Sequence, residues 1–122
     1  MFRGTLLVLV VSLMLAAVYA DDEKYSDKYD TLDIDAALAD DATRNKYFNC
    51  FIGNGPCTED AAYWKNNFPE AVVTKCAKCT DWQKTAFDKI AAWYAENDEQ
   101  AWTALMEKSI AEAKARNIPG AK

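Results

Sequence analysis

Apolar side chains recur every three or four positions along most of the chain, which is the period of an amphipathic helix. No segment alternates apolar and polar residues with a period of two, as a half-buried strand does. The pattern therefore predicts a single all-α domain of five or six short helices. The expected helices cover approximately residues 32–38, 42–51, 59–68 with an apolar continuation to 73, 82–97 and 99–116.

Residues that typically begin or end helices stand at the edges of these segments. The candidate N-caps are Asp33, Thr58, Thr80 and Asp98. Gln83 follows Thr80 at the spacing of a capping box, and Gly53 stands where a left-handed residue ends a helix. Pro69 predicts either a new helix start or a kink. The polar residues 21–31 are expected to form an irregular arm that lays its tyrosines against the body.

The first twenty residues have the organisation of a secretory signal peptide. Arg3 gives a positive start, residues 6–15 are almost entirely apolar, and residues 18–20 have the small-x-small pattern of a cleavage site. A membrane anchor is the alternative, but the apolar run is shorter than the roughly 20 residues that a span needs. We therefore expect residues 1–20 to be removed and residues 21–122 to form a secreted, extracellular domain without stable membrane insertion.

Charge and the absence of histidine narrow the possible functions. Without the signal peptide the chain has 13 basic and 19 acidic residues, and an acidic surface repels nucleic-acid phosphates and anionic lipids. No histidine occurs in the sequence, so the chain can form neither a Ser-His-Asp or Cys-His arrangement nor a His-ligated zinc site. We expect no enzyme activity, no cofactor, no metal and no nucleic-acid partner. The sequence also identifies no carboxylate that could act as a pH switch near neutrality.

Four cysteines have the spacing C-x6-C-x18-C-x2-C, and sequence alone allows three pairings. The turn over residues 53–56 should bring Cys57 near Cys50, and two residues three apart in a helical turn lie about 5 Å apart. These distances favour the pairs Cys50–Cys57 and Cys76–Cys79. A zinc site is disfavoured by the wide first spacing and the oxidising compartment. A redox role for Cys76 and Cys79 remains possible, although the strand context of a thioredoxin-like domain is absent.

Several short motifs surround these cysteines, and together they resemble the arthropod chemosensory proteins, also called the OS-D or pheromone-binding A10 family. The resemblance covers about residues 27–105 and includes, besides the cysteine spacing, the stretches Asp27-Lys28-Tyr29-Asp30, Tyr47-Phe48-Asn49-Cys50, Gly55-Pro56-Cys57-Thr58, Cys76-x-Lys78-Cys79 and Gln83-Lys84. It implies six helices around an apolar channel, with disulfides joining the first cysteine to the second and the third to the fourth. It also implies carriage of long-chain fatty acids, alcohols, esters and semiochemicals.

The resemblance also suggests which residues line the channel. It implies that Tyr29, Tyr47 and Trp102 are associated with the pocket. Apolar positions on the predicted helices extend the set of candidate ligand-binding residues, which is Tyr29, Ile34, Tyr47, Phe48, Phe68, Val72, Val73, Phe87, Ile90, Tyr94, Trp102, Leu105 and Met106. The chain departs from the family beyond Met106, where an Ala-rich helix continues instead of a Tyr-Asp-Pro turn.

Each of these apolar positions could equally belong to a packed core without a ligand. Residues 21–122 contain only 24 large apolar side chains, of which thirteen are aromatic. The sequence therefore predicts a monomeric carrier of a long-chain apolar molecule, with two alternatives left open. One is a secreted signalling or interaction protein with a solid core, and the other is a thiol-disulfide redox protein. The charged residues Glu70, Lys75 and Lys84 are expected on the solvated face.

Overall fold

The structure is a computed structural model that describes residues 24–121, and all its regular elements there are helices. The predicted signal peptide lies outside the described residues. The helices are α2 (Ile34–Ala39), α3 (Asp41–Ile52), α4 (Glu59–Thr74), α5 (Asp81–Asn97) and α6 (Glu99–Ala115). The prediction of an all-α domain of five or six helices is confirmed.

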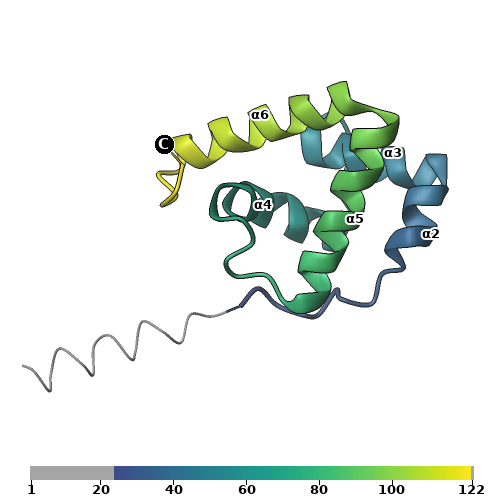
Figure 1. The fold of residues 1–122 in the computed structure, drawn as a ribbon, viewed down its shortest axis with the longest axis horizontal. Helices are drawn as coiled ribbons and strands as arrows, with labels where there is room; N and C mark the ends of the chain where they lie inside the picture. The colour runs from purple at the N-terminus through teal and green to yellow at the C-terminus, as the bar shows by residue number, and fades with distance from the viewer. Residues whose placement is uncertain (1–23, 122) are drawn as a thin grey trace, which may run out of the picture.

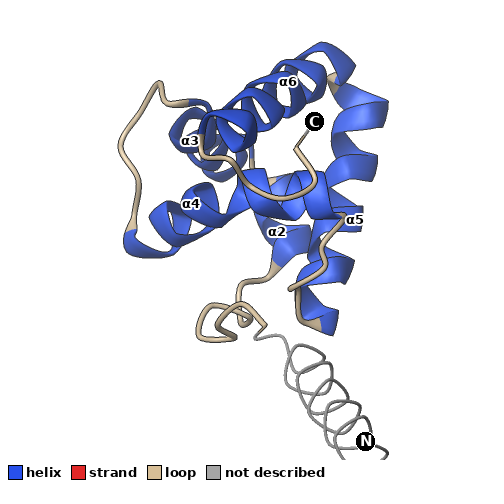
Figure 2. Ribbon diagram, turned by 90° about the vertical axis from the view of Figure 1, so that its left-hand side faces the viewer, coloured by secondary structure: helices blue, strands red, loops and turns tan. Residues whose placement is uncertain are grey.

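The five helices enclose a shared interior instead of forming a parallel bundle. Figure 1 shows α5 crossing the molecule at a steep angle to α6, with α4 on one side of α5 and α2 on the other. Helix α6 packs on α3, α4 and α5, and α2 packs on α3 and α5. In Figure 2 the helices surround the centre, while the N-terminal arm and the connecting loops lie at the periphery.

Local sequence signals explain where most helices begin. The side chains of Asp33, Thr58 and Asp98 each accept a hydrogen bond from a backbone N–H in the first turn of the helix that follows. Thr80 and Gln83 form the complete capping box at the start of α5. Gly53 ends α3 with φ 86°, a left-handed conformation that glycine adopts without a steric penalty.

Helix α4 continues without interruption through Pro69, so the structure shows neither a new helix start nor a break at this residue. Pro69 is among the most completely buried side chains of the described residues. Its ring therefore packs inside the domain, and the apolar face of α4 continues beyond it. The predicted new helix start is therefore wrong, and Pro69 is buried within one continuous helix.

Both predicted disulfides are present. Cys50 pairs with Cys57 across the turn after α3, at a Cα–Cα distance of 5.0 Å. Cys76 pairs with Cys79 in the loop between α4 and α5, at a Cα–Cα distance of 4.9 Å. Each bridge closes a short local loop, so the relative placement of the helices depends on packing and not on the cross-links.

The N-terminal arm is fixed to the start of α5 by hydrogen bonds. The backbone N–H of Tyr25 donates to the Lys78 carbonyl at 2.8 Å. The Gln83 side-chain amide donates to the Ser26 carbonyl and to an Asp30 carboxylate oxygen, both at 2.9 Å. Gln83 thus serves the capping box and the arm together, which explains why this polar side chain is only 4% exposed.

Candidate functional site

The helices leave an apolar cavity of about 150 Å³ in the interior. Every described helix contributes to its wall, and so do the N-terminal arm and the Cys76–Cys79 loop. The aromatic wall residues are Tyr25, Tyr47, Phe48, Phe51, Trp64, Phe68, Trp82, Phe87, Tyr94 and Trp102. The aliphatic wall residues are Leu32, Ile34, Ala37, Leu38, Ala71, Ala86, Ile90 and Leu105. The space therefore suits a molecule that water solvates poorly.

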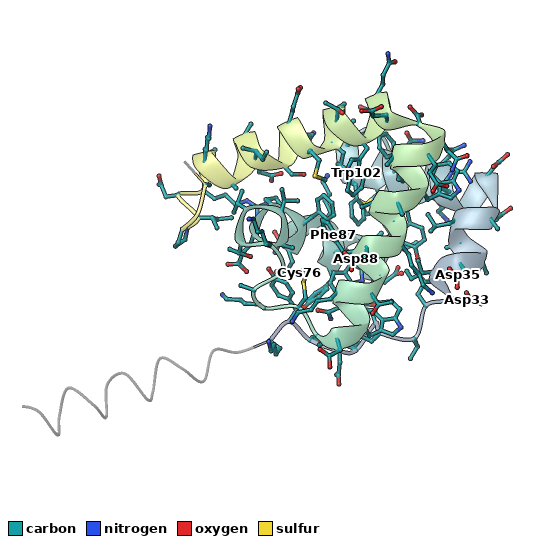
Figure 3. The ribbon with its side chains drawn as sticks, viewed as in Figure 1. Asp33, Asp35, Cys76, Phe87, Asp88 and Trp102 are labelled. Carbon is teal, nitrogen blue, oxygen red and sulfur yellow. A yellow bond between two sulfur atoms is a disulfide. The ribbon has the colours of Figure 1, made fainter. Side chains whose placement is uncertain are left out.

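Six of these rings form one connected group, which we call the aromatic cluster: Phe48, Phe51, Phe68, Phe87, Tyr94 and Trp102. Phe68 stacks on Phe87 with ring centroids 5.6 Å apart, and Trp102 stacks on Tyr94 at 5.7 Å. Phe87 and Trp102 meet edge to face at 6.0 Å, and Figure 3 shows both side chains in the space between α4, α5 and α6. Flat rings from four helices thus bound the cavity.

Tyr47 and Tyr94 bring hydroxyl groups into this largely apolar wall. The Tyr47 hydroxyl donates to Asp60 Oδ2 at 2.6 Å, and burial together with this hydrogen bond raises the pKa of Tyr47 to about 12. Burial also raises the pKa of Tyr94, although the nearby positive charge of Arg44 works in the opposite direction. Both phenols are therefore neutral at physiological pH, and each can donate or accept a hydrogen bond.

The opposite part of the wall is formed by the arm and the α4–α5 loop. Tyr25 is buried there, and its hydroxyl donates to Glu70 Oε1 at 2.8 Å. Lys78 Nζ lies 3.4 Å from the second oxygen of Glu70. Glu70 is therefore a partly buried anchor for the arm, and the expectation that it lies on the solvated face is wrong for this residue. Lys75 and Lys84 are exposed as expected.

The comparisons with known proteins agree with this geometry. Residues 25–117 match the sequence model of the insect pheromone-binding family, A10/OS-D. The chain belongs to this family. Ejaculatory bulb-specific protein 3 of Drosophila melanogaster is 36% identical over 103 residues, which are 84% of this chain and 81% of that protein. Allergen Tha p 1 of Thaumetopoea pityocampa is 32% identical over 103 residues, which are 84% of this chain and 82% of the allergen.

A solved structure of this kind carries an apolar ligand. The chemosensory protein in complex with bromo-dodecanol superposes with a TM-score of 0.69 at 28% identity, over 77% of this chain and 94% of that chain. The all-α fold with its interior space is thus the fold of the chemosensory proteins. The long α6, which runs without a break from Glu99 to Ala115, agrees with the Ala-rich continuation that distinguishes this chain beyond Met106.

Most of the sequence-predicted site residues lie together in the cavity wall of this A10/OS-D chain. They are Ile34, Tyr47, Phe48, Phe68, Phe87, Ile90, Tyr94, Trp102 and Leu105. Val72, Val73 and Met106 are half-buried but are not among the wall residues. The helical period explains this, because each of them is rotated by about 100° or more from a neighbouring wall residue, Ala71 or Leu105.

Tyr29 is likewise placed away from the cavity. Its hydroxyl donates to Glu59 Oε1 at 2.9 Å, and its ring lies 5.5 Å from that of Tyr63. Lys28 reaches the same Glu59 oxygen at 3.2 Å, so three polar residues hold the arm at the start of α4. The other arm tyrosine, Tyr25, lines the cavity instead.

The wall also includes residues that were not among the predicted site residues. Phe51, Trp64 and Trp82 lie on the apolar faces of their helices, so their periodicity was a sufficient signal. Cys76, Cys79 and Gln83 line the cavity because of loop and cap geometry, which periodicity does not reveal. Asn67 is a polar residue on the wall face of α4, three residues after Trp64 and four before Ala71. Arg44 is the only charged side chain in the wall among the described residues.

Among residues 24–121, no helix combines the length and the apolar character that crossing a bilayer requires. The polar surface of the described helices agrees with this finding. Their charged side chains form ion pairs at the surface, such as Lys89 with Asp35 at 2.9 Å.

Proposed function

We propose that this chain is a secreted carrier that reversibly binds long-chain apolar molecules, such as fatty acids, alcohols, esters and semiochemicals, in the interior cavity. The observation that carries the proposal is the cavity itself, with apolar wall residues contributed by every described helix. The bromo-dodecanol complex of a chemosensory protein supports the same ligand chemistry. The role requires no catalysis, and the protein acts as a monomer.

The energetics suit reversible transport. Each buried methylene contributes about 0.8 kcal/mol, so a chain of roughly twelve carbons gains about 10 kcal/mol before the costs of association and ordering. At most about 6 kcal/mol remain, which corresponds to dissociation constants of tens of micromolar or weaker. Binding of this strength holds a ligand during transport and still releases it.

The size of the cavity limits what it can hold without rearrangement. A volume of about 150 Å³ equals that of engineered cavities that accept benzene, which has about six carbon atoms. A longer chain therefore has to displace wall side chains or extend through the cavity mouth. We expect the half-buried rings of the aromatic cluster to move, because no side chain packs against them on the side that faces the cavity.

The cavity also bears on the two alternative functions. In a protein that binds no ligand, an apolar cavity only lowers stability, because larger side chains that filled it would stabilise the fold. Cys76 and Cys79 are joined in a disulfide, and Cys79 is only 3% exposed, so a redox partner would have poor access to it. Both observations favour the carrier over the alternatives.

A titration tests the proposal. Residues 21–122 are titrated with 1-dodecanol while tryptophan fluorescence and displacement of a bound apolar fluorophore are followed, since Trp64, Trp82 and Trp102 line the cavity. Ala86→Phe fills the cavity from α5 and should weaken binding at least tenfold, whereas Ala92→Phe, on the exposed side of the same helix, should not. Absence of quenching and of displacement in the wild type would refute the carrier.

A further inference from the structure

Arg44 is the only charged residue in the cavity wall among the residues that the structure describes. It lies in the first turns of α3, and its side chain is only 14% exposed. Removing a cation from water is costly unless an anion or several hydrogen-bond acceptors replace the lost hydration. The Arg44 guanidinium therefore requires an anion or several hydrogen-bond acceptors as partners.

The orientation of the guanidinium is fixed by neutral partners. Its Nη1 donates to the Leu38 carbonyl at 2.6 Å, at the end of α2, where no basic residue of α2 itself is present. The exposed carbonyls at a helix C-terminus attract a cation. The guanidinium carbon also lies 4.0 Å from the centroid of the Trp93 ring, a cation–π contact from α5. Three helices thus hold Arg44 at the wall.

The only carboxylate paired with Arg44 among the described residues lies on the surface. Nη2 lies 2.6 Å from Asp41 Oδ1, one turn earlier in α3, and the Asp41 side chain is 85% exposed. Ion pairs of such exposed groups contribute little, because water solvates the carboxylate equally well. These contacts use two of the five N–H donors of a guanidinium. The remaining donors are available to a further acceptor.

Arg44 stands at the end of the α5 wall where Trp93 and Tyr94 lie. Close to it are Tyr94, whose pKa responds to the Arg44 charge, and Tyr47 and Phe48 from the same helix. At the far end of the α5 wall stands Trp82, twelve residues before Tyr94, which is about 18 Å along the helix. An extended carbon chain advances roughly 1.25 Å per bond, so this length matches a chain of about fifteen carbons, and a twelve-carbon chain fits within it.

We propose that Arg44 binds the head group of a long-chain carboxylate, whose hydrocarbon chain extends along α5 toward Trp82. This inference rests on the carrier function proposed above and specifies its ligand as an anionic amphiphile. A carboxylate can accept two parallel N–H bonds from one guanidinium, which a hydroxyl or an ester oxygen cannot do. The Tyr94 hydroxyl can donate to the same head group. The protein should therefore prefer fatty acids to alcohols and esters of equal chain length.

The test compares ligands that differ only in the head group. Affinities for dodecanoate, 1-dodecanol and methyl dodecanoate are measured at neutral pH, below the micelle concentration, with the wild type and with Arg44→Leu. The measured quantity is the affinity ratio of dodecanoate to dodecanol, which we expect to fall about tenfold in Arg44→Leu. Lys46→Gln changes the net charge equally at an exposed position of α3 and should leave the ratio unchanged.

Each outcome distinguishes the two proposals. A ratio that is the same in wild type and Arg44→Leu overturns the role of Arg44 but leaves the carrier intact. Failure of the wild type to bind any of the three ligands contradicts the carrier itself, and with it this inference. If Arg44→Leu does not fold, Arg44→Gln replaces it, because the glutamine amide can still donate to the Leu38 carbonyl, and the same fall in the ratio is expected.

Discussion

Truncation of Phe87 tests whether the aromatic cluster stabilises the fold and also limits the size of the cavity. Phe87 makes two ring contacts, with Phe68 at 5.6 Å and with Trp102 at 6.0 Å. Two such pairs contribute about 1–3 kcal/mol beyond simple burial. Phenylalanine-to-alanine changes in cores cost about 3–5 kcal/mol. Because Phe87 is half-buried and borders empty space, we expect Phe87→Ala to cost about 3 kcal/mol, near the lower limit.

The loss is measured by thermal unfolding followed by circular dichroism. For a domain of about 100 residues, 3 kcal/mol corresponds to a Tm decrease of about 12–24 °C. Phe87→Leu keeps an aliphatic side chain but loses both ring pairs, so its cost should be about 1–2 kcal/mol. Ile110→Ala, at the exposed outer face of α6, is the control and should cost less than about 1 kcal/mol.

The same variant should change ligand selectivity. Removal of the six ring carbons enlarges the cavity where a chain would lie, and each additional buried methylene adds about 0.8 kcal/mol, or about fourfold in affinity. We therefore expect Phe87→Ala to favour tetradecanol over dodecanol more strongly than the wild type does, while Ile110→Ala does not. A stability loss below 1 kcal/mol would show that Phe87 is not packed as described. If Phe87→Ala loses stability as expected but keeps the chain-length preference of the wild type, the ligand does not bind beside Phe87.

Three further predictions concern the groups around the cavity. The pKa of Tyr47 is about 12 in the folded state and 10.0 in the unfolded state. Its contribution to stability is therefore complete below pH 10 and is lost as the pH rises toward 12. Tyr47→Phe should make the urea midpoint decrease less steeply over this pH range. Replacing Cys50 and Cys57 together by alanine should cost about 2.5 kcal/mol in chemical denaturation, from the eight-residue loop they close. Gln83→Ala should destabilise the domain by about 1–2 kcal/mol and accelerate hydrogen exchange of the Tyr25 amide, because the arm loses two hydrogen bonds.

Features set by neighbouring residues in the chain were predictable from the sequence. The N-caps Asp33, Thr58 and Asp98 act on backbone groups within three residues, so their effect does not depend on the tertiary fold. The two disulfides close short loops, and local geometry was sufficient to favour their pairing. The apolar wall residues of α5 were predictable because one apolar face runs along the whole helix, whereas Gln83 was not.

Features that depend on distant partners were not predictable. Tyr25 and Tyr29 lie four residues apart in an arm without regular structure, and nothing in the sequence distinguishes them. Tyr25 turns inward because Glu70, 45 residues later, accepts its hydroxyl, and Tyr29 turns outward to Glu59. The resemblance implied a pocket role for Tyr29, whereas the structure places Tyr25 at the wall.

Arg44 is a charged residue on the apolar face of α3. The apolar face of α3 runs through Tyr47, Phe48 and Phe51, and Arg44 occupies the position one turn earlier on that face. A charged residue on an apolar face has three ways to avoid an unpaired buried charge. Its side chain can extend until the charged end reaches water, it can pair with an opposite charge, or it can bind a ligand. Trp93 and the end of α2 cover this guanidinium, so it cannot extend freely into water. The carboxylate it is paired with, Asp41, is itself exposed, which leaves a ligand head group as the partner that would complete the site.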